Sequence, residues 1–282
     1  MITILITTCD RYDTSLPLTL MSIINQSLKP NRIVLVDDSK DKKFYNHKIL
    51  QNILILLKEY NIEFDYFYGE SKGSSPALKI GLDNIVDGWV FKIDDDNILP
   101  YNALELFNKN IKPNIGAMSG IITDEVLSNY YKDIPENIPQ EKDGYYNRIE
   151  DIFTDLNIQM YKEQDDKIKK VEHIYSNYFF RRDLADDDHP FEQLSPSAHR
   201  DETIFTYNIF KKGYDLIVIP QVKIFHLHNK TGNSKWDAYK DNNERFFLKK
   251  LEEWKIVPDK LEIYDDGNMI TTKRGDKTYL II

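Results

Sequence analysis

Cysteine is almost absent from this sequence of 282 residues, because Cys9 is the only one. A single thiol excludes an intramolecular disulfide framework and fits a reducing compartment. Long apolar runs are also missing, and no window approaches 18 uninterrupted apolar residues. Apolar strand residues already begin at Ile2, which leaves no space before them for a signal peptide. We therefore expect a soluble cytoplasmic protein without a transmembrane segment.

Positive charge is scarce, since 37 lysines and arginines face 46 aspartates and glutamates, for a net charge of -9. Such a chain lacks the broad positive field that non-specific nucleic-acid binding needs, although a local patch could still hold a nucleic-acid acceptor. The length permits one large domain. We expect this domain over residues 1–235, with an insertion at about 123–170, and a C-terminal extension over 236–282.

Strands and helices alternate through the first part of the chain. Strands are predicted at Ile2–Thr7, Arg32–Val36, Glu63–Tyr68, Trp89–Ile93 and Ile115–Ile122, and helices at Leu16–Ile24, Lys48–Tyr60 and Ser75–Ile85. Such alternation predicts an α/β fold with a mainly parallel central sheet flanked by helices, and a ligand site at the carboxyl ends of the strands.

The later part of the chain is less regular. The acidic insertion at 123–170 has weak periodicity, and we expect it to carry one or two helices. Beyond it the patterns predict a helix at Glu202–Lys212, a strand pair at Leu216–Val218 and Val222–Phe225, a helix at Trp236–Trp254 and a β-hairpin after that helix.

Three consecutive aspartates, Asp94 to Asp96, follow the predicted strand Trp89–Ile93. Packing like charges together is unfavourable unless a cation compensates them, and carboxylate oxygens suit Mg²⁺ or Mn²⁺. Asp94 and Asp96 are two residues apart, so on an extended segment they point to the same side. A triplet like this can also be a solvated loop or the cap of a helix that opens at Asn97, but its place at the sheet edge favours a metal site.

The order of these segments resembles that of family 2 glycosyltransferases with the GT-A fold, over roughly residues 1–230. The resemblance is carried by Ile4–Arg11, an opening strand and nucleotide loop; by Val34–Ser39, a strand that ends in aspartates; by Lys72–Gly81; by Ile93–Asn97, an Asp-X-Asp motif; by Arg200–Thr203 with Gly213-Tyr214; and by Ile224–His228. It implies a donor site for a nucleoside-diphosphate sugar, formed by Thr7, Thr8, Asp10, Arg11, Asp37, Asp38, Lys79, Asp94 and Asp95. Lys79 stands where that family commonly has asparagine.

The resemblance also implies a bound Mn²⁺ or Mg²⁺ and a catalytic base. Asp96 is the expected direct ligand, joined by Asp94 and by His226 or His228 from a strand end. The acid pair of the family is reversed in this sequence, so spacing favours Glu202 as the base whereas residue type favours Asp201. Alternatively, the two histidines are structural, and the acid pair only stabilises the positive end of a helix.

The implied reaction is an inverting transfer of the sugar to a hydroxyl acceptor, which could be a glycan, a protein or a modified nucleobase. Three other functions remain open from the residues alone: a nucleotidyltransferase with the same acidic metal site, a receiver-like signalling domain and a sugar-binding protein without turnover. The loop after the first strand lacks the glycines that a nucleotidyltransferase usually has there, and a receiver domain leaves more than half the chain unexplained.

Overall fold

The computed structural model describes most of the chain. It covers residues 1–123, 139–153, 157–161, 165–185, 199–227 and 236–258, and the strand residues 262–265, 270–274 and 277–280, with side chains described only at 1–123, 139–153, 157–161, 165–185, 199–227 and 242–258. His228 lies outside these residues.

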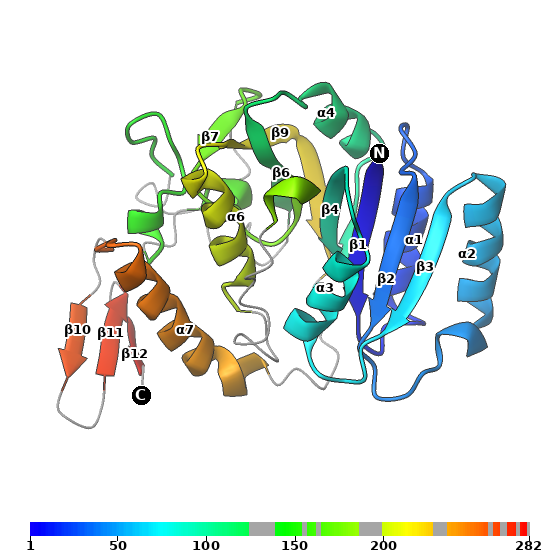
Figure 1. The fold of residues 1–282 in the computed structure, drawn as a ribbon, viewed down its shortest axis with the longest axis horizontal. Coiled ribbons are helices and arrows are strands. Elements are labelled where there is room, and N and C mark those ends of the chain that lie inside the picture. Colours follow the sequence, from blue (N-terminus) through cyan, green and yellow to red (C-terminus); the bar gives the residue numbers. More distant parts are fainter. Residues whose placement is uncertain are drawn as a thin grey trace.

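The first half of the chain forms the parallel part of a nine-stranded sheet (Figure 1). Its strands are β1 (Ile2–Thr8), β2 (Arg32–Asp37), β3 (Glu63–Tyr68) and β4 (Trp89–Asp94), and its helices are α1 (Ser15–Ile24), α2 (Lys48–Glu59) and α3 (Ser74–Asp83). They lie in the order β3-β2-β1-β4. The predicted strands and helices agree with these bounds to within two residues, because β1, β2 and β4 are largely buried apolar runs and β3 is an aromatic segment.

The strand register brings the polar ends of three strands together. Thr8 on β1 pairs with Asp37 on β2, and Thr7 pairs with Asp94 on β4. Because all three strands run in one direction, both acidic segments and the loop after β1 meet at the same sheet edge, as the sequence pattern predicts.

The second half of the sheet is mixed. Its strands are β5 (Asn97–Ile98), β6 (Ile115–Thr123), β7 (Lys169–Val171), β8 (Tyr178–Arg181) and β9 (Asp215–His226). Strand β8 lies antiparallel between β4 and β6, β6 pairs with β9 in parallel, and β5 and β7 both pair with β9. The prediction that Asn97 opens a helix was wrong, because Asn97 and Ile98 pair with β9 and the following helix α4 (Ala103–Lys109) begins later.

Strand β9 replaces the predicted pair of strands. It runs on from Leu216 to Phe225, and its pairing with β6 shifts between Gly120 and Ile121. A Cβ on Gly120 would lie 2.2 Å from the carbonyl oxygen of Val222, so only glycine lets the backbone of this irregular segment come so close. The proline and glutamine at 220–221 therefore mark an irregularity inside one strand and not a turn between two.

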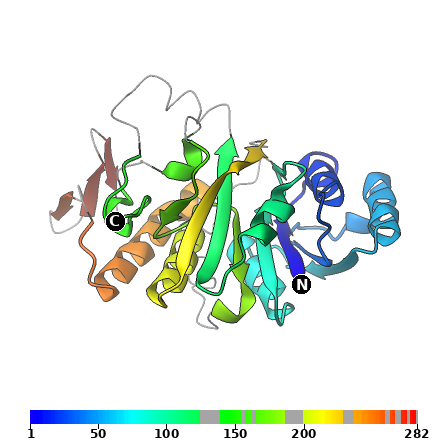
Figure 2. The ribbon, with the colours of Figure 1, turned by 90° about the horizontal axis from the view of Figure 1, so that it is seen from above.

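Helices cover both faces of the sheet (Figure 1, Figure 2). One hydrophobic cluster packs α1, α2 and α4 on one face, and a second packs α3 and α6 (Asp201–Lys211) on the other. A third cluster joins α6 to α7 (Trp236–Glu253), and α7 leads to a three-stranded antiparallel sheet of β10 (Glu262–Asp265), β11 (Ile270–Arg274) and β12 (Lys277–Leu280). Among the described residues, no helix is both long enough and apolar enough to cross a membrane.

The insertion departs from its predicted helices in the part that the structure describes. That part holds two short 3-10 turns, Ile149–Asp151 and Ile158–Met160, before β7 begins. The first turn contributes Ile149 to the cluster between α6 and α7, and Gln159 of the second donates a hydrogen bond to Ser119 in β6. The described insertion thus packs onto the main domain.

Candidate active site

Asp94 ends β4, and its carboxylate is held between a lysine and a serine. Lys92 Nζ lies 2.6 Å from Asp94 Oδ1, and Ser176 Oγ donates to Asp94 Oδ2 at 2.9 Å. The Asp94 N–H donates to Asn177 Oδ1 at 3.1 Å. Burial alone would raise the pKa of Asp94, but the Lys92 ammonium lowers it to about 2. Asp94 is therefore ionised at neutral pH and already has a cation beside it.

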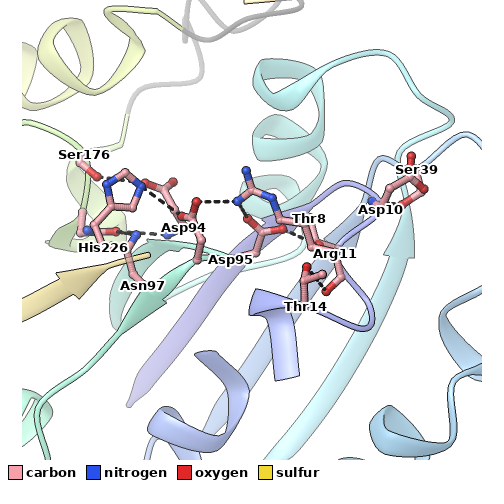
Figure 3. A network of polar contacts seen from close by, with 12 residues as sticks. Thr8, Asp10, Arg11, Thr14, Ser39, Asp94, Asp95, Asn97, Ser176 and His226 are labelled. Carbon is pink, nitrogen blue, oxygen red and sulfur yellow. Dashed lines mark hydrogen bonds and ion pairs between the residues drawn. The ribbon is translucent and has the colours of Figure 1, made fainter. Parts of the chain in front are cut away.

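Asp95 and Asp96 are buried and share the guanidinium of Arg11, and Figure 3 shows the contact of Arg11 with Asp95. Arg11 Nη1 lies 2.6 Å from Asp95 Oδ1 and 2.8 Å from Asp96 Oδ2, and Thr8 Oγ1 donates to Asp95 Oδ2 at 2.6 Å. Burial raises the pKa of Asp95 to about 7 although the charge of Arg11 opposes the rise. An ion pair thus joins the loop after β1 to the acidic loop after β4.

His226 lies at the end of β9, opposite the acidic loop (Figure 3). Its Nε2 is 3.4 Å from Asp96 Oδ1, and the neighbouring Leu227 N–H donates to the Asp96 carbonyl. Within the described ranges, no three Asp, Glu, His or Cys side chains converge as a complete metal site. Asp96 and His226 could supply two ligands to a divalent cation, whose other positions substrate phosphates and water would then fill. His228 stays a prediction because it is outside the described residues.

Asp37 is fully buried and has no room for another partner. The hydroxyls of Tyr12 and Tyr66 donate to its Oδ2 at 2.7 and 2.6 Å, and the N–H and hydroxyl of Ser39 donate to its Oδ1. A carboxylate offers about four acceptor positions, and all four are used here. In this arrangement Asp37 ties the ends of β2 and β3 to the loop after β1, and its contact with the donor stays a prediction.

Asp38 keeps acceptor positions for a ligand. The backbone N–H groups of Lys72 and Gly73 donate one hydrogen bond to each of its oxygens, at 2.9 and 2.7 Å. Burial raises the pKa of Asp38 to about 6, against the effect of these two donors. Within the part of the chain that the structure describes, two of about four acceptor positions on Asp38 are filled, so it suits a hydroxyl or amide donor better than Asp37 does.

The other residues predicted to bind the donor lie at different distances from this centre. The Asp10 N–H donates to Ser39 Oγ at 2.8 Å, and Asp10 has a positive φ of 54°, which turns the loop after β1 back over β2. Thr7 pairs with Asp94 at the end of the register between β1 and β4. Lys79, in contrast, is exposed on α3 and forms an ion pair with Asp83 at 2.8 Å, so it would have to leave that partner to reach a phosphate.

The acid pair opens α6. Asp201 is buried, and its Oδ1 accepts the N–H of Glu202 at 2.7 Å, whereas Glu202 is half-buried. Burial and the adjacent Glu202 carboxylate raise the pKa of Asp201 well above its usual value, although the charge of Lys92 opposes them. Asp201 thus favours the protonated form and accepts a backbone N–H in the first turn of α6, while Glu202 is the more accessible carboxylate.

A family model for glycosyl transferase family 2 matches residues 3–188. The chain belongs to this family. No curated protein sequence matches it, so the likeness to individual proteins is structural. The match includes the acidic loop and both strands that frame it, but ends before the acid pair and before His226.

Solved glycosyltransferases have the same GT-A fold as this family 2 chain. GalNAc-T7 with UDP, GalNAc and Mn²⁺ is 17% identical with a TM-score of 0.56, and the match covers 86% of this chain and 47% of that one. The mannosyltransferase PcManGT from Pyrobaculum calidifontis, with GDP-Man and Mn²⁺, is 16% identical with a TM-score of 0.53. That match covers 90% of this chain and 63% of the mannosyltransferase. TarS from S. aureus is 14% identical with a TM-score of 0.53 and covers 89% and 43%. The chain thus spans between about two fifths and two thirds of the length of these proteins.

Several site residues of this family 2 chain were not found from sequence. Ser176 and Asn177 hold Asp94, and Asn177 Oδ1 also accepts from Asn97 Nδ2 at 3.3 Å. They lie 82 and 83 residues from Asp94, so no local pattern connects them. Lys92 did carry a signal, because a lysine inside a strand that is otherwise apolar needs a buried partner.

Proposed function

We propose that this chain is a metal-dependent inverting glycosyltransferase that moves a sugar from a nucleoside-diphosphate sugar to a hydroxyl acceptor. The observation that carries the proposal is that buried Lys92 contacts Asp94 of the acidic loop and also feels the charge of the acid pair that opens α6. Burial alone would lower the pKa of Lys92, but the carboxylates of Asp94, Asp201 and Glu202 raise it. The charges of the acidic loop and of the candidate base thus both act on Lys92, which supports a role for the two segments in one site.

The donor would lie along the edge formed by β1, β2 and β4. Asp38 would accept a hydrogen bond from the ribose or the base, and Arg11 would contact the diphosphate. Asp96, with His226 and Asp94, would hold a divalent cation. A bound Mn²⁺ or Mg²⁺ would stabilise the negative charge that develops on the departing diphosphate.

Glu202 would act as the base. The acceptor oxygen forms a bond to the anomeric carbon as the bond from that carbon to the diphosphate oxygen breaks, and Glu202 takes the hydroxyl proton. The exchange occurs on opposite faces of the sugar, so the product has the inverted configuration. Asp201, which favours the protonated form, serves this step by accepting the Glu202 N–H and fixing the start of α6.

The proposal is tested by incubating the protein with a panel of nucleotide sugars and candidate hydroxyl acceptors, with Mn²⁺ or with a chelator. We expect release of nucleoside diphosphate from one donor, and a metal requirement for that release. Release of pyrophosphate from nucleoside triphosphates would instead indicate a nucleotidyltransferase. Donor binding without any release, with every acceptor tested, would contradict turnover and support a sugar-binding protein.

A further inference from the structure

Arg200 directly precedes the acid pair, yet its side chain leads away from the site and into α7. Its Nη2 lies 2.9 Å from Glu244 Oε1 and its Nε lies 3.0 Å from Glu244 Oε2, so the guanidinium makes a two-pronged contact. His199 Nε2 also lies 2.8 Å from Glu244 Oε2. One carboxylate of the C-terminal helix therefore holds both residues that lead into α6.

This ion pair is enclosed by aromatic rings. The Arg200 guanidinium lies 5.0 Å from the ring centroid of Phe247 and 5.5 Å from that of Phe153. The side chains of Arg200 and Glu244 are only 11% and 17% exposed, so water screens their attraction weakly. Arginine suits such a buried, stacked and two-pronged contact, which lysine cannot reproduce.

The backbone of Arg200 is strained at the point where its side chain makes this contact. Arg200 has a φ of 75° and a ψ of 1°, in the left-handed region that residues with a side chain seldom adopt, and it is the residue from which α6 begins. Its carbonyl accepts the N–H of Ile204 at 3.0 Å. The turn directly before Asp201 and Glu202 therefore has an unfavourable backbone conformation, and the side chain of the same residue is bound to Glu244.

Helix α7 is held on α6 independently of this contact. The shared hydrophobic cluster contains Ile204 and Tyr207 from α6 and Phe247 and Leu251 from α7. Removing the charge of Glu244 thus leaves an apolar interface that keeps the two helices together. This separation makes it possible to ask what the ion pair does apart from folding.

We propose that Glu244 is a positioning residue that acts through Arg200 to hold the base pair at the start of α6, so that helix α7 is part of the catalytic unit. The proposal rests on the proposed function in one respect, namely that Glu202 is the base. The charge of Glu202 also reaches this pair, since burial alone would lower the pKa of Arg200 but Glu244 and then Glu202 raise it. Glu244 itself contacts no reacting atom.

The test compares Glu244→Gln with Glu253→Gln on the same helix. Glu253 pairs with Lys250 at 2.7 Å, and its side chain is 58% exposed, so it is the matched control for loss of one carboxylate from α7. We expect Glu244→Gln to lower kcat by about tenfold or more, the scale for displacing a group in the site, with the KM for the donor changed less than twofold. The control should leave both unchanged.

Amide hydrogen exchange supplies a readout that needs no turnover. Exchange at 201–206 should rise in Glu244→Gln, whereas exchange in β1 and β4 should stay the same. Arg200→Gly should behave like Glu244→Gln, because glycine keeps the left-handed backbone but loses the ion pair. If Glu244→Gln does not fold, the same measurements on Arg200→Lys, which keeps the charge but not the two-pronged contact, take its place.

Unchanged kcat together with unchanged exchange at 201–206 would overturn the proposal. An equal loss in kcat and in donor affinity would also overturn it, because that result indicates general disruption of the domain. If the wild type transfers no sugar, the proposed function fails, and increased exchange at 201–206 still decides whether Glu244 holds the start of α6.

Discussion

Lys92 and Asp94 form an ion pair of 2.6 Å between two residues on the same face of β4, at the point where the strand reaches the site. Their side chains are 11% and 33% exposed. Lys92 offsets the charge of Asp94 from within β4. Arg11, in the loop after β1, offsets the charges of Asp95 and Asp96. The three aspartates are therefore compensated by the protein's own cations on both sides.

Lys92→Met should destabilise the protein because it leaves Asp94 without its partner. We expect a loss of about 1–3 kcal/mol in the free energy of unfolding at pH 7, less than for a fully buried pair because Asp94 is partly exposed. The Lys92 contribution holds above the usual aspartate pKa of 3.8 and is lost as the pH falls through about 2, where folded Asp94 takes up its proton. Urea unfolding of Lys92→Met and Lys92→Arg at pH 7 checks this, and equal stability of the methionine variant and the wild type would contradict it.

The ionisation of Asp38 should make the free energy of unfolding depend on pH. Because burial raises its pKa from 3.8 to about 6, the folded state holds a proton that the unfolded state has released, so this group costs stability as the pH rises from 3.8 through 6. The variant Asp38→Asn has no carboxyl to ionise and therefore does not lose stability in this way. We expect the stability of the wild type relative to this variant to fall by about 2–3 kcal/mol between pH 4 and pH 7.

Denaturant unfolding of both proteins at the two pH values measures that difference. Asn cannot accept from both N–H groups of the loop at 72–73, so the variant should be less stable than the wild type at pH 4. A difference that does not change with pH would show that Asp38 has an ordinary pKa.

Calorimetry on Asp38→Ala is a separate check, which should show weaker donor binding with a smaller change in turnover.

The base assignment is tested by two matched amide substitutions. Glu202→Gln keeps the shape but removes the proton acceptor, so transfer should fall by about 10²-fold or more while donor and metal binding stay nearly unchanged. Asp201→Asn should reduce transfer less, because buried Asp201 favours its protonated form and serves the helix start. Steady-state transfer assays with calorimetric donor binding check both variants. The reverse ranking would make Asp201 the base, and normal turnover in both would leave the acid pair as a helix-start feature.

The strands of the parallel half were predictable because β1, β2 and β4 are largely buried apolar runs and β3 is rich in aromatic residues. The acidic segments were predictable as neighbours for the same reason, since parallel strands end at one edge. Strand β8 was not predicted as a sheet strand between β4 and β6, because Tyr178–Arg181 is only four residues long and its antiparallel partners lie far away in the chain. Local periodicity has no information about such pairings.

The partners of the site side chains were the least predictable part. The residue type of Asp37 marked it as a ligand contact, but Tyr12, Tyr66 and Ser39 occupy its oxygens, and these donors come from three different segments. The contact between Arg200 and Glu244 spans 44 residues and depends on a backbone conformation that no pattern in the sequence marks. Residue type and spacing could locate the site, whereas the network of partners required the structure.

The most direct test of metal-dependent sugar transfer compares release of nucleoside diphosphate by the wild type and by Asp96→Ala, across a range of Mn²⁺ concentrations with the donor that the panel identifies. Asp96 is 4% exposed and faces His226 and Arg11, so alanine removes an expected ligand without removing an apolar contact of the core. The account predicts release that rises with Mn²⁺ in the wild type and is abolished in a folded Asp96→Ala protein. Near-normal release that Mn²⁺ still stimulates in Asp96→Ala would contradict it.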